Sequence, residues 1–137
     1  MGYIDDIGAV RGNVTDHAVN IFVLYFKQFP QHQDFFEGYK GKDPDSLKSV
    51  AKFKGHVTKV TSMLLDILEK TGDAGALQKY CDTLAKMSQH KGLGATEFKD
   101  LGTVVVSYVK QTLGGSCDAA GWESAFNTLN TKLGPML

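Results

Sequence analysis

Two histidines, His56 and His90, have the surroundings of side chains that could bind a metal or a metal-containing group. His90 comes three residues after Met87, near the end of a stretch from 77 to 93 whose apolar residues recur at helical intervals. Gly92 then provides a residue type that commonly ends a helix. A lone histidine on an apolar helix face is more often a hydrogen-bonded core residue. However, His56 lies in a second long helical pattern, and two such histidines together favour a binding site.

The spacing of these two histidines restricts the chemistry. His90 lies 34 positions after His56, too far for a two-histidine motif on one helix. Neither has a cysteine, aspartate or glutamate beside it at the spacing of zinc ligands, so we do not expect a structural zinc site. Two histidines that face each other across an apolar gap suit a flat cofactor with an axial position on each side, and haem is the obvious candidate.

The elements that must position these histidines are helices. Apolar residues repeat at intervals of three and four from 4 to 11, from 14 until Pro30, from 43 to 70, from 77 to 91 and from 96 to 111. A last helix follows Ser116, which we expect to cap it, and the segment 31–42 is expected to form a short helical turn and a loop. The helix predicted from 43 to 70 begins at Asp43-Pro44 and carries two apolar stripes, one of which includes His56. The sequence therefore predicts an all-α fold of six to eight helices.

Length and composition exclude several classes of function. The 137 residues fit one domain, 1–137, and 15 basic side chains balance 15 acidic ones, which argues against a nucleic-acid or anionic-membrane partner. Cys81 and Cys117 are too few and too far apart for a disulfide framework. No apolar run is long enough to cross a membrane and no signal peptide is visible, so we expect an intracellular protein.

Six residues stand at a characteristic spacing along the chain: Phe22, Pro30, Phe36, His56, Val60 and His90. Through these residues the chain resembles the globin family over essentially its whole length, which implies a globin fold that encloses a haem. The segments YKGK, LKSVAKFKGH and MSQHKGL, with the short overall length, further resemble the small marine-annelid globins of the dehaloperoxidase and coelomic haemoglobin type.

The resemblance implies haem b as the cofactor, with His90 as the proximal ligand of the iron and His56 as the distal residue that hydrogen-bonds the bound ligand. The residues expected to contact the haem are Phe36, Val60, Met87, Leu93, Phe98 and Leu101. The residues expected to line the ligand pocket are Phe22, Phe36, His56 and Val60, although plain core packing would explain Phe22 and Val60 equally well.

Three functions are compatible with this arrangement. The first is reversible binding of O₂ or another diatomic ligand, by a monomer or weak homodimer in the cytoplasm of an oxygen-carrying cell. The second is a haem peroxidase of the dehaloperoxidase type that oxidises halophenols with H₂O₂, with His56 as the catalytic acid and base. The third is electron transfer through a haem with both histidines on the iron. We favour oxygen binding, because no carboxylate accompanies His90 locally and no arginine accompanies His56.

Three further residues remain open at this stage. Tyr39 stands where globins commonly have phenylalanine, and we expect a surface tyrosine in preference to a redox-active phenol. His17 and His32 match no ligand position of the family, and we expect both to lie on the surface.

Overall fold

The structure is a computed structural model that describes residues 2–35, 37–86 and 94–136. It contains six α-helices, namely α1 (Tyr3–Arg11), α2 (Val14–Gln28), α3 (Ala51–Glu69), α4 (Ala74–Lys86), α5 (Ala95–Leu113) and α6 (Ala119–Leu133). Short 3₁₀ helices connect or end them: η1 (Pro30–Phe35), η2 (Glu37–Tyr39), η3 (Pro44–Ser49), η5 (Gly114–Ser116) and η6 (Gly134–Met136). The described residues form no strand, and the predicted all-α class is confirmed.

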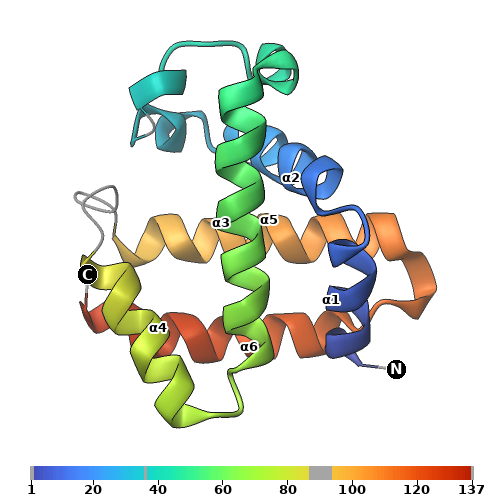
Figure 1. Cartoon of the computed structure of the whole chain (residues 1–137), viewed down its shortest axis with the longest axis vertical. Coiled ribbons are helices and arrows are strands. Elements are labelled where there is room, and N and C mark those ends of the chain that lie inside the picture. Colours follow the sequence, from blue (N-terminus) through green and yellow to red (C-terminus); the bar gives the residue numbers. More distant parts are fainter. Residues whose placement is uncertain (1, 36, 87–93, 137) are drawn as a thin grey trace.

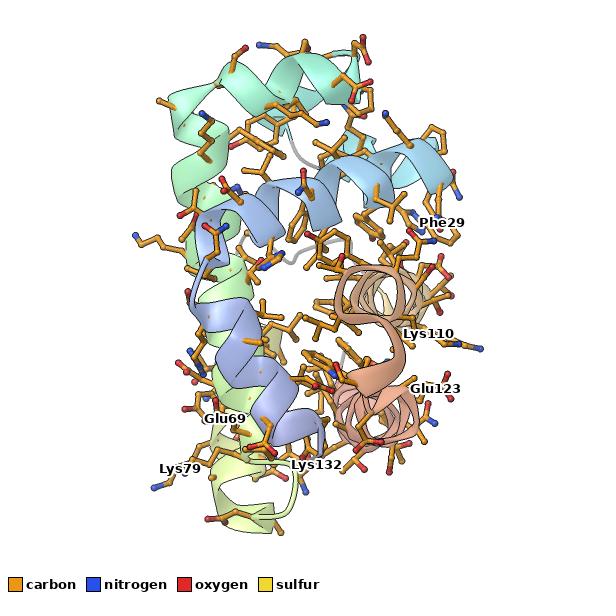
Figure 2. All side chains as sticks on the ribbon, turned by 90° about the vertical axis from the view of Figure 1, so that its right-hand side faces the viewer. Phe29, Glu69, Lys79, Lys110, Glu123 and Lys132 are labelled. Carbon is orange, nitrogen blue, oxygen red and sulfur yellow. The ribbon has the colours of Figure 1, made fainter. Side chains whose placement is uncertain are left out.

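The helices pack in two crossing layers. In Figure 1, α3 runs along the front of the molecule, and the antiparallel pair α5 and α6 crosses behind it at a steep angle. Helix α2 packs against both α3 and α5 and so joins the two layers. Figure 2, turned by 90°, shows α5 and α6 end on, with α1 and α3 on the opposite side and side chains between them. The side chains of the two layers therefore meet between them.

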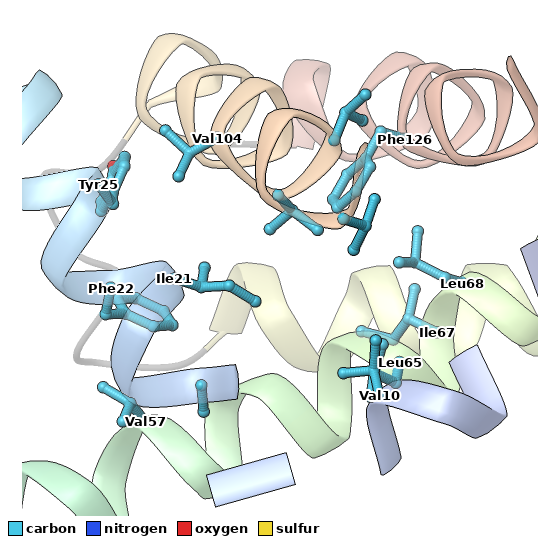
Figure 3. Packing of buried hydrophobic residues seen from close by; sticks show 14 of the residues in the cluster. Val10, Ile21, Phe22, Tyr25, Val57, Leu65, Ile67, Leu68, Val104 and Phe126 are labelled. Atoms are coloured by element: carbon cyan, nitrogen blue, oxygen red, sulfur yellow. The ribbon is translucent and has the colours of Figure 1, made fainter. Parts of the chain in front are cut away.

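The hydrophobic core lies between the two layers (Figure 3). Ile21 and Phe22 of α2 and Leu65 and Leu68 of α3 lie in the same cluster of buried side chains, into which Phe126 of α6 also packs. Each large apolar side chain removed from water contributes about 1.5–3 kcal/mol to folding. The inner side expected for the last helix is confirmed, since its four members Trp122, Phe126, Leu129 and Leu133 are all buried.

The helix predicted from 43 to 70 is divided in two by the structure. Asp43 caps it as expected, because its side chain accepts from Asp45 N at 3.2 Å, but the first turns form the 3₁₀ helix η3. Val50 then adopts an extended conformation, with φ −90° and ψ 112°, and α3 starts after it. The hydroxyl of Ser46 bonds the carbonyl of Asp43 at 2.6 Å, the kind of local bond that competes with regular α-helix.

Two other expected helix starts are also shifted. Asp118, rather than Ser116, caps the last helix, because its side chain accepts from Gly121 N at 3.1 Å. Helix α5 begins after Gly94, whose N–H donates to Glu97 Oε2 at 2.9 Å, so the expected cap at Thr96 is wrong. In both places an acidic side chain satisfies a backbone N–H that would otherwise be left open at a helix start.

The N-terminal helix is attached to α6 through a buried carboxylate. Asp6 is 7% exposed, and its Oδ2 accepts from Trp122 Nε1 at 3.1 Å and from Asp118 N at 2.8 Å. Tyr3 N donates to Asp118 Oδ2 at 3.1 Å, which reinforces the same junction. These bonds hold α1 against the start of α6.

Both cysteines are free in the structure. Cys81 is fully buried on α4 and acts as a small core residue, as expected, whereas Cys117 is half-buried. Burial raises the pKa of each thiol. None of the helices described is both long enough and apolar enough to cross a membrane.

Candidate functional site

Helix α3 carries His56 on a stripe that is only partly covered by the rest of the chain. Phe53 and Val57 point into the core and are buried, whereas His56, Val60 and Met63 are half-buried. Successive positions three or four apart lie on one face of a helix, so the last three residues form a continuous strip. The division into two predicted stripes holds only in part, because Ile67, predicted on the stripe of His56, is buried, whereas Leu64, predicted on the other stripe, is half-buried.

Helix α5 presents a second group of partly covered apolar side chains. Phe98 and Leu101 are both half-buried and pack against the core. Leu101 and Leu64 of α3 border the same small apolar cavity of about 10 Å³, so the two helices adjoin there. Phe22 of α2 also borders this cavity, and it is only 2% exposed. Phe22 thus packs in the core and at the same time closes one side of the region between α3 and α5.

The environment of His56 favours its neutral form. The pKa of its imidazole is lowered, first by burial and then by the positive charges of Lys52 and Lys59 on the same helix. The Nδ1 atom of His56 lies 3.4 Å from the Oη of Tyr39, and the two rings stack with their centroids 6.1 Å apart and 28° between their planes. A neutral imidazole carries one N–H donor and one nitrogen acceptor, so the residue can both receive and give a hydrogen bond.

Tyr39 is buried, and the expectation of a surface tyrosine is wrong. Its side chain is 5% exposed, and its ring meets the ring of Phe53 edge to face at 5.1 Å and 88°. The amide of Gln33 donates to the carbonyl of Tyr39 at 2.6 Å and to that of Lys42 at 2.8 Å, which fixes the turn that carries the tyrosine. Burial raises the pKa of the phenol, so it is protonated at neutral pH.

His32 is also buried, in contrast to the surface position expected for it. It is 5% exposed, and its Nε2 lies 2.7 Å from Asp100 Oδ2 on α5. Its ring stacks on that of Phe29 at 5.4 Å and 14°. Phe29 lies three residues earlier on a tight helical turn, a spacing that could have indicated the contact; Asp100 is 68 positions away and could not have been found in this way.

His17 is half-buried rather than a free surface histidine. Its Nδ1 lies 2.7 Å from the Oη of Tyr108, and the two rings meet edge to face with centroids 5.7 Å apart. This pair joins α2 to α5 at a place that includes neither His56 nor Tyr39. We therefore assign His17 to helix packing.

Part of the expected site lies outside the described residues. These expected site residues are Phe36, Met87, His90 and Leu93. The described part of α4 reaches Lys86 and α5 begins at Ala95, so the segment that contains His90, and the helix end predicted at 91, lie outside the described residues. Within the described ranges, no three histidine, cysteine or acidic side chains gather in a way that could hold a metal ion.

The described residues of the expected site are compatible with a bound apolar cofactor that makes one polar contact, with His56. The half-buried apolar side chains that pack against the core include Val60, Met63 and Leu64 of α3 and Phe98 and Leu101 of α5. His56 contributes a neutral imidazole to the same strip of α3. Apolar side chains beside one neutral imidazole are compatible with a flat, largely apolar cofactor such as haem.

Comparison with known proteins gives a consistent picture. The family model described as Globin matches residues 19–133. Among curated proteins, Globin CTT-V of Chironomus thummi piger is 30% identical over 122 residues, which cover 86% of this chain and 75% of that protein. The globin of Nerita albicilla is 27% identical over 127 residues, 88% of this chain and 79% of its own. Among solved structures, ferric Aplysia limacina myoglobin superposes with a TM-score of 0.79 at 21% identity and covers 90% of this chain and 86% of its own, a likeness of fold.

Proposed function

The chain belongs to the globin family, and from this premise we propose that it binds haem b and reversibly binds O₂. The observation that carries the proposal is the neutral, half-buried His56 on a strip of partly covered apolar side chains. Haem supplies an iron with a coordination position at which a diatomic ligand can bind. The remaining tasks belong to the chain, which must hold the cofactor, exclude water and stabilise the ligand.

His90 is the residue proposed to ligate the iron, on the basis of the family resemblance. The side chains proposed to pack against the cofactor are Phe36, Val60, Met87, Leu93, Phe98 and Leu101. Replacement of His90 by glycine tests this assignment, because free imidazole can then take the place of the missing side chain. We expect His90→Gly to lose its haem or to show an altered absorption spectrum, and added imidazole to restore the original spectrum. A variant with an unchanged spectrum would exclude His90 as the ligand.

His56 is proposed to donate a hydrogen bond from Nε2 to the bound ligand. O₂ acquires negative charge when it binds, so an N–H donor favours the bound state over the free ligand. A hydrogen bond to a charged acceptor contributes about 1.5–3 kcal/mol, or roughly ten- to hundredfold in affinity. Phe22 and Val60 are proposed to complete the ligand pocket and to keep water away from it.

The test of this role is the rate of O₂ dissociation from His56→Leu. Leucine is similar in size to histidine but cannot donate a hydrogen bond to the bound ligand. We therefore expect O₂ to dissociate about tenfold faster or more, and the haem iron to autoxidise faster. The matched control is His17→Leu, which removes a half-buried histidine from the α2–α5 contact and should leave both rates unchanged. Equal dissociation rates for wild type and His56→Leu would contradict the proposal.

The resemblance to dehaloperoxidase-type globins supports a second candidate, oxidation of halophenols by H₂O₂. The favourable observation is again the lowered pKa of His56, since a neutral imidazole can accept a proton from one oxygen of peroxide and return it to the other as water leaves. The measurement is trichlorophenol oxidation per haem beside an ordinary oxygen-storage globin. A rate at least tenfold above the control, about 1.4 kcal/mol in activation free energy, would favour the peroxidase, and an equal rate would exclude it.

A further inference from the structure

The contact between Tyr39 and His56 joins a buried phenol to the proposed ligand-binding histidine. The ring of Tyr39 is already fixed by its edge-to-face contact with Phe53, at 5.1 Å, and by the bond from Gln33 to its carbonyl, at 2.6 Å. Packing alone would be served equally well by phenylalanine at this position. Among the described residues, the hydroxyl places Oη 3.4 Å from His56 Nδ1.

The direction of this hydrogen bond follows from the protonation states of the two groups. Burial raises the pKa of Tyr39 and lowers that of His56, so both are neutral near pH 7. A phenol O–H is a stronger donor than a neutral imidazole N–H, and an imidazole nitrogen is a stronger acceptor than a phenol oxygen. The favourable arrangement is therefore donation from Tyr39 Oη to His56 Nδ1. A neutral imidazole that accepts at Nδ1 must carry its hydrogen on Nε2.

We propose that Tyr39 is a positioning residue for His56, whose hydroxyl bonds Nδ1 and thereby holds the imidazole in the tautomer and orientation that offer Nε2–H to the bound ligand. The inference rests on the proposed function, because it presumes that His56 donates to that ligand. In many functional histidines, a hydrogen bond to one ring nitrogen determines which of the two nitrogens is protonated, and Tyr39 would do this for His56.

The first test reads the tautomer directly. Nitrogen-15 NMR of the CO-bound ferrous protein distinguishes protonated from unprotonated ring nitrogens, and we expect Nε2 of His56 to carry the hydrogen in wild type. In Tyr39→Phe, which keeps the ring and removes only the hydroxyl, we expect a measurable fraction of the Nδ1–H tautomer. A wild-type protein with hydrogen on Nδ1 would overturn the inference, and this measurement does not depend on the folding of any variant.

The second test follows the bound ligand. We expect Tyr39→Phe to split or broaden the CO stretching band, because His56 then samples more than one orientation. We also expect it to speed O₂ dissociation about two- to fivefold, which corresponds to roughly 0.4–1 kcal/mol. The matched control is Tyr3→Phe, which removes a hydroxyl that bonds Leu68 O and lies near Thr71, at the α1–α3 contact. That variant should change neither the band nor the rate.

A double variant separates the inference from the proposed function. If Tyr39 acts through His56, then Tyr39→Phe should have no further effect on dissociation in the His56→Leu background. An additive effect would overturn the positioning role. If His56→Leu alone alters dissociation while Tyr39→Phe changes neither tautomer, band nor rate, the inference fails and the proposed function stands. If His56→Leu leaves dissociation unchanged, the proposed function fails, and the proposal that His56 is positioned for a ligand fails with it.

Discussion

The carboxylate of Asp6 offers a quantitative test of how the N-terminal helix is held in place. One oxygen of this side chain, Oδ2, accepts both the indole N–H of Trp122, at 3.1 Å, and the backbone N–H of Asp118, at 2.8 Å. Trp122 is fully buried, so water cannot replace the acceptor if the carboxylate is removed. The half-buried backbone of Asp118 is more accessible, and the loss there should be smaller.

These contacts allow the effect of Asp6→Ala to be estimated. A buried donor left without an acceptor destabilises a fold by about 1–3 kcal/mol, and two donors are affected here. Relief of the desolvation of the buried carboxylate offsets part of that loss. We therefore expect the free energy of unfolding to fall by about 2–4 kcal/mol, measured by urea denaturation of the haem-loaded protein at one fixed concentration.

Two variants decide whether this reasoning is right. Asp6→Asn can place its amide oxygen where Oδ2 lies and keep both bonds, so we expect it to lose about 1 kcal/mol or less. Glu123→Ala, which removes an exposed acidic side chain from α6, should stay within about 0.5 kcal/mol of wild type. An Asp6→Ala protein as stable as wild type would refute the argument. An Asp6→Asn protein as weak as Asp6→Ala would show that the charge, rather than the acceptor, stabilises the junction.

Further predictions concern packing, a buried hydroxyl and pH. A Cβ on Gly102 would lie 3.0 Å from Phe126 Cδ1, so Gly102→Ala should destabilise the α5–α6 crossing by about 1 kcal/mol despite its gain in helix propensity. Gly8→Ala, where a Cβ meets nothing within 4 Å, should stabilise by about 0.5–1 kcal/mol, and thermal unfolding of both variants would check the opposite signs. Within the described parts of the chain, no partner lies within hydrogen-bond distance of the buried Thr61 Oγ1, so Thr61→Val should raise the free energy of unfolding by about 1 kcal/mol, and a loss in urea denaturation would contradict this. Burial lowers the pKa of His56 in the folded protein below its ordinary value of about 6.5. As pH falls, the imidazole is therefore protonated at a higher pH in the unfolded chain than in the folded protein, and the free energy of unfolding declines below about pH 6.5. Paired denaturation of wild type and His56→Leu at about pH 7 and pH 5 should therefore show wild type losing more stability on acidification, and equal losses would contradict the shift.

Most of the fold could be predicted because helix periodicity is a local property of the sequence. The apolar spacing located the six α-helices of the described residues and placed Trp122, Phe126, Leu129 and Leu133 on a buried side, as the structure confirms. The spacing also put His56 on a partly apolar stripe of α3, next to residues that the rest of the chain leaves half-covered. The proposed iron ligand His90 remains a prediction from the same pattern and from the family resemblance. Helix starts were predicted less well, since Asp118 caps α6 in place of Ser116 and α5 begins after Gly94, whose N–H is bonded by Glu97.

The contacts that give individual side chains their roles were decided only by the tertiary structure. Tyr39 meets His56 from a different element 17 positions away, and His32 meets Asp100 across 68 positions. No local sequence pattern indicates that His56 and Asp100 contact these residues. Tyr39 and His32, which the sequence analysis placed on the surface, are therefore buried in the structure. The helical period of a sequence indicates which face of one helix is apolar, but not which other element will cover that face. The burial, protonation and hydrogen-bond partners of a side chain depend on that covering element, and so only the tertiary structure determines them.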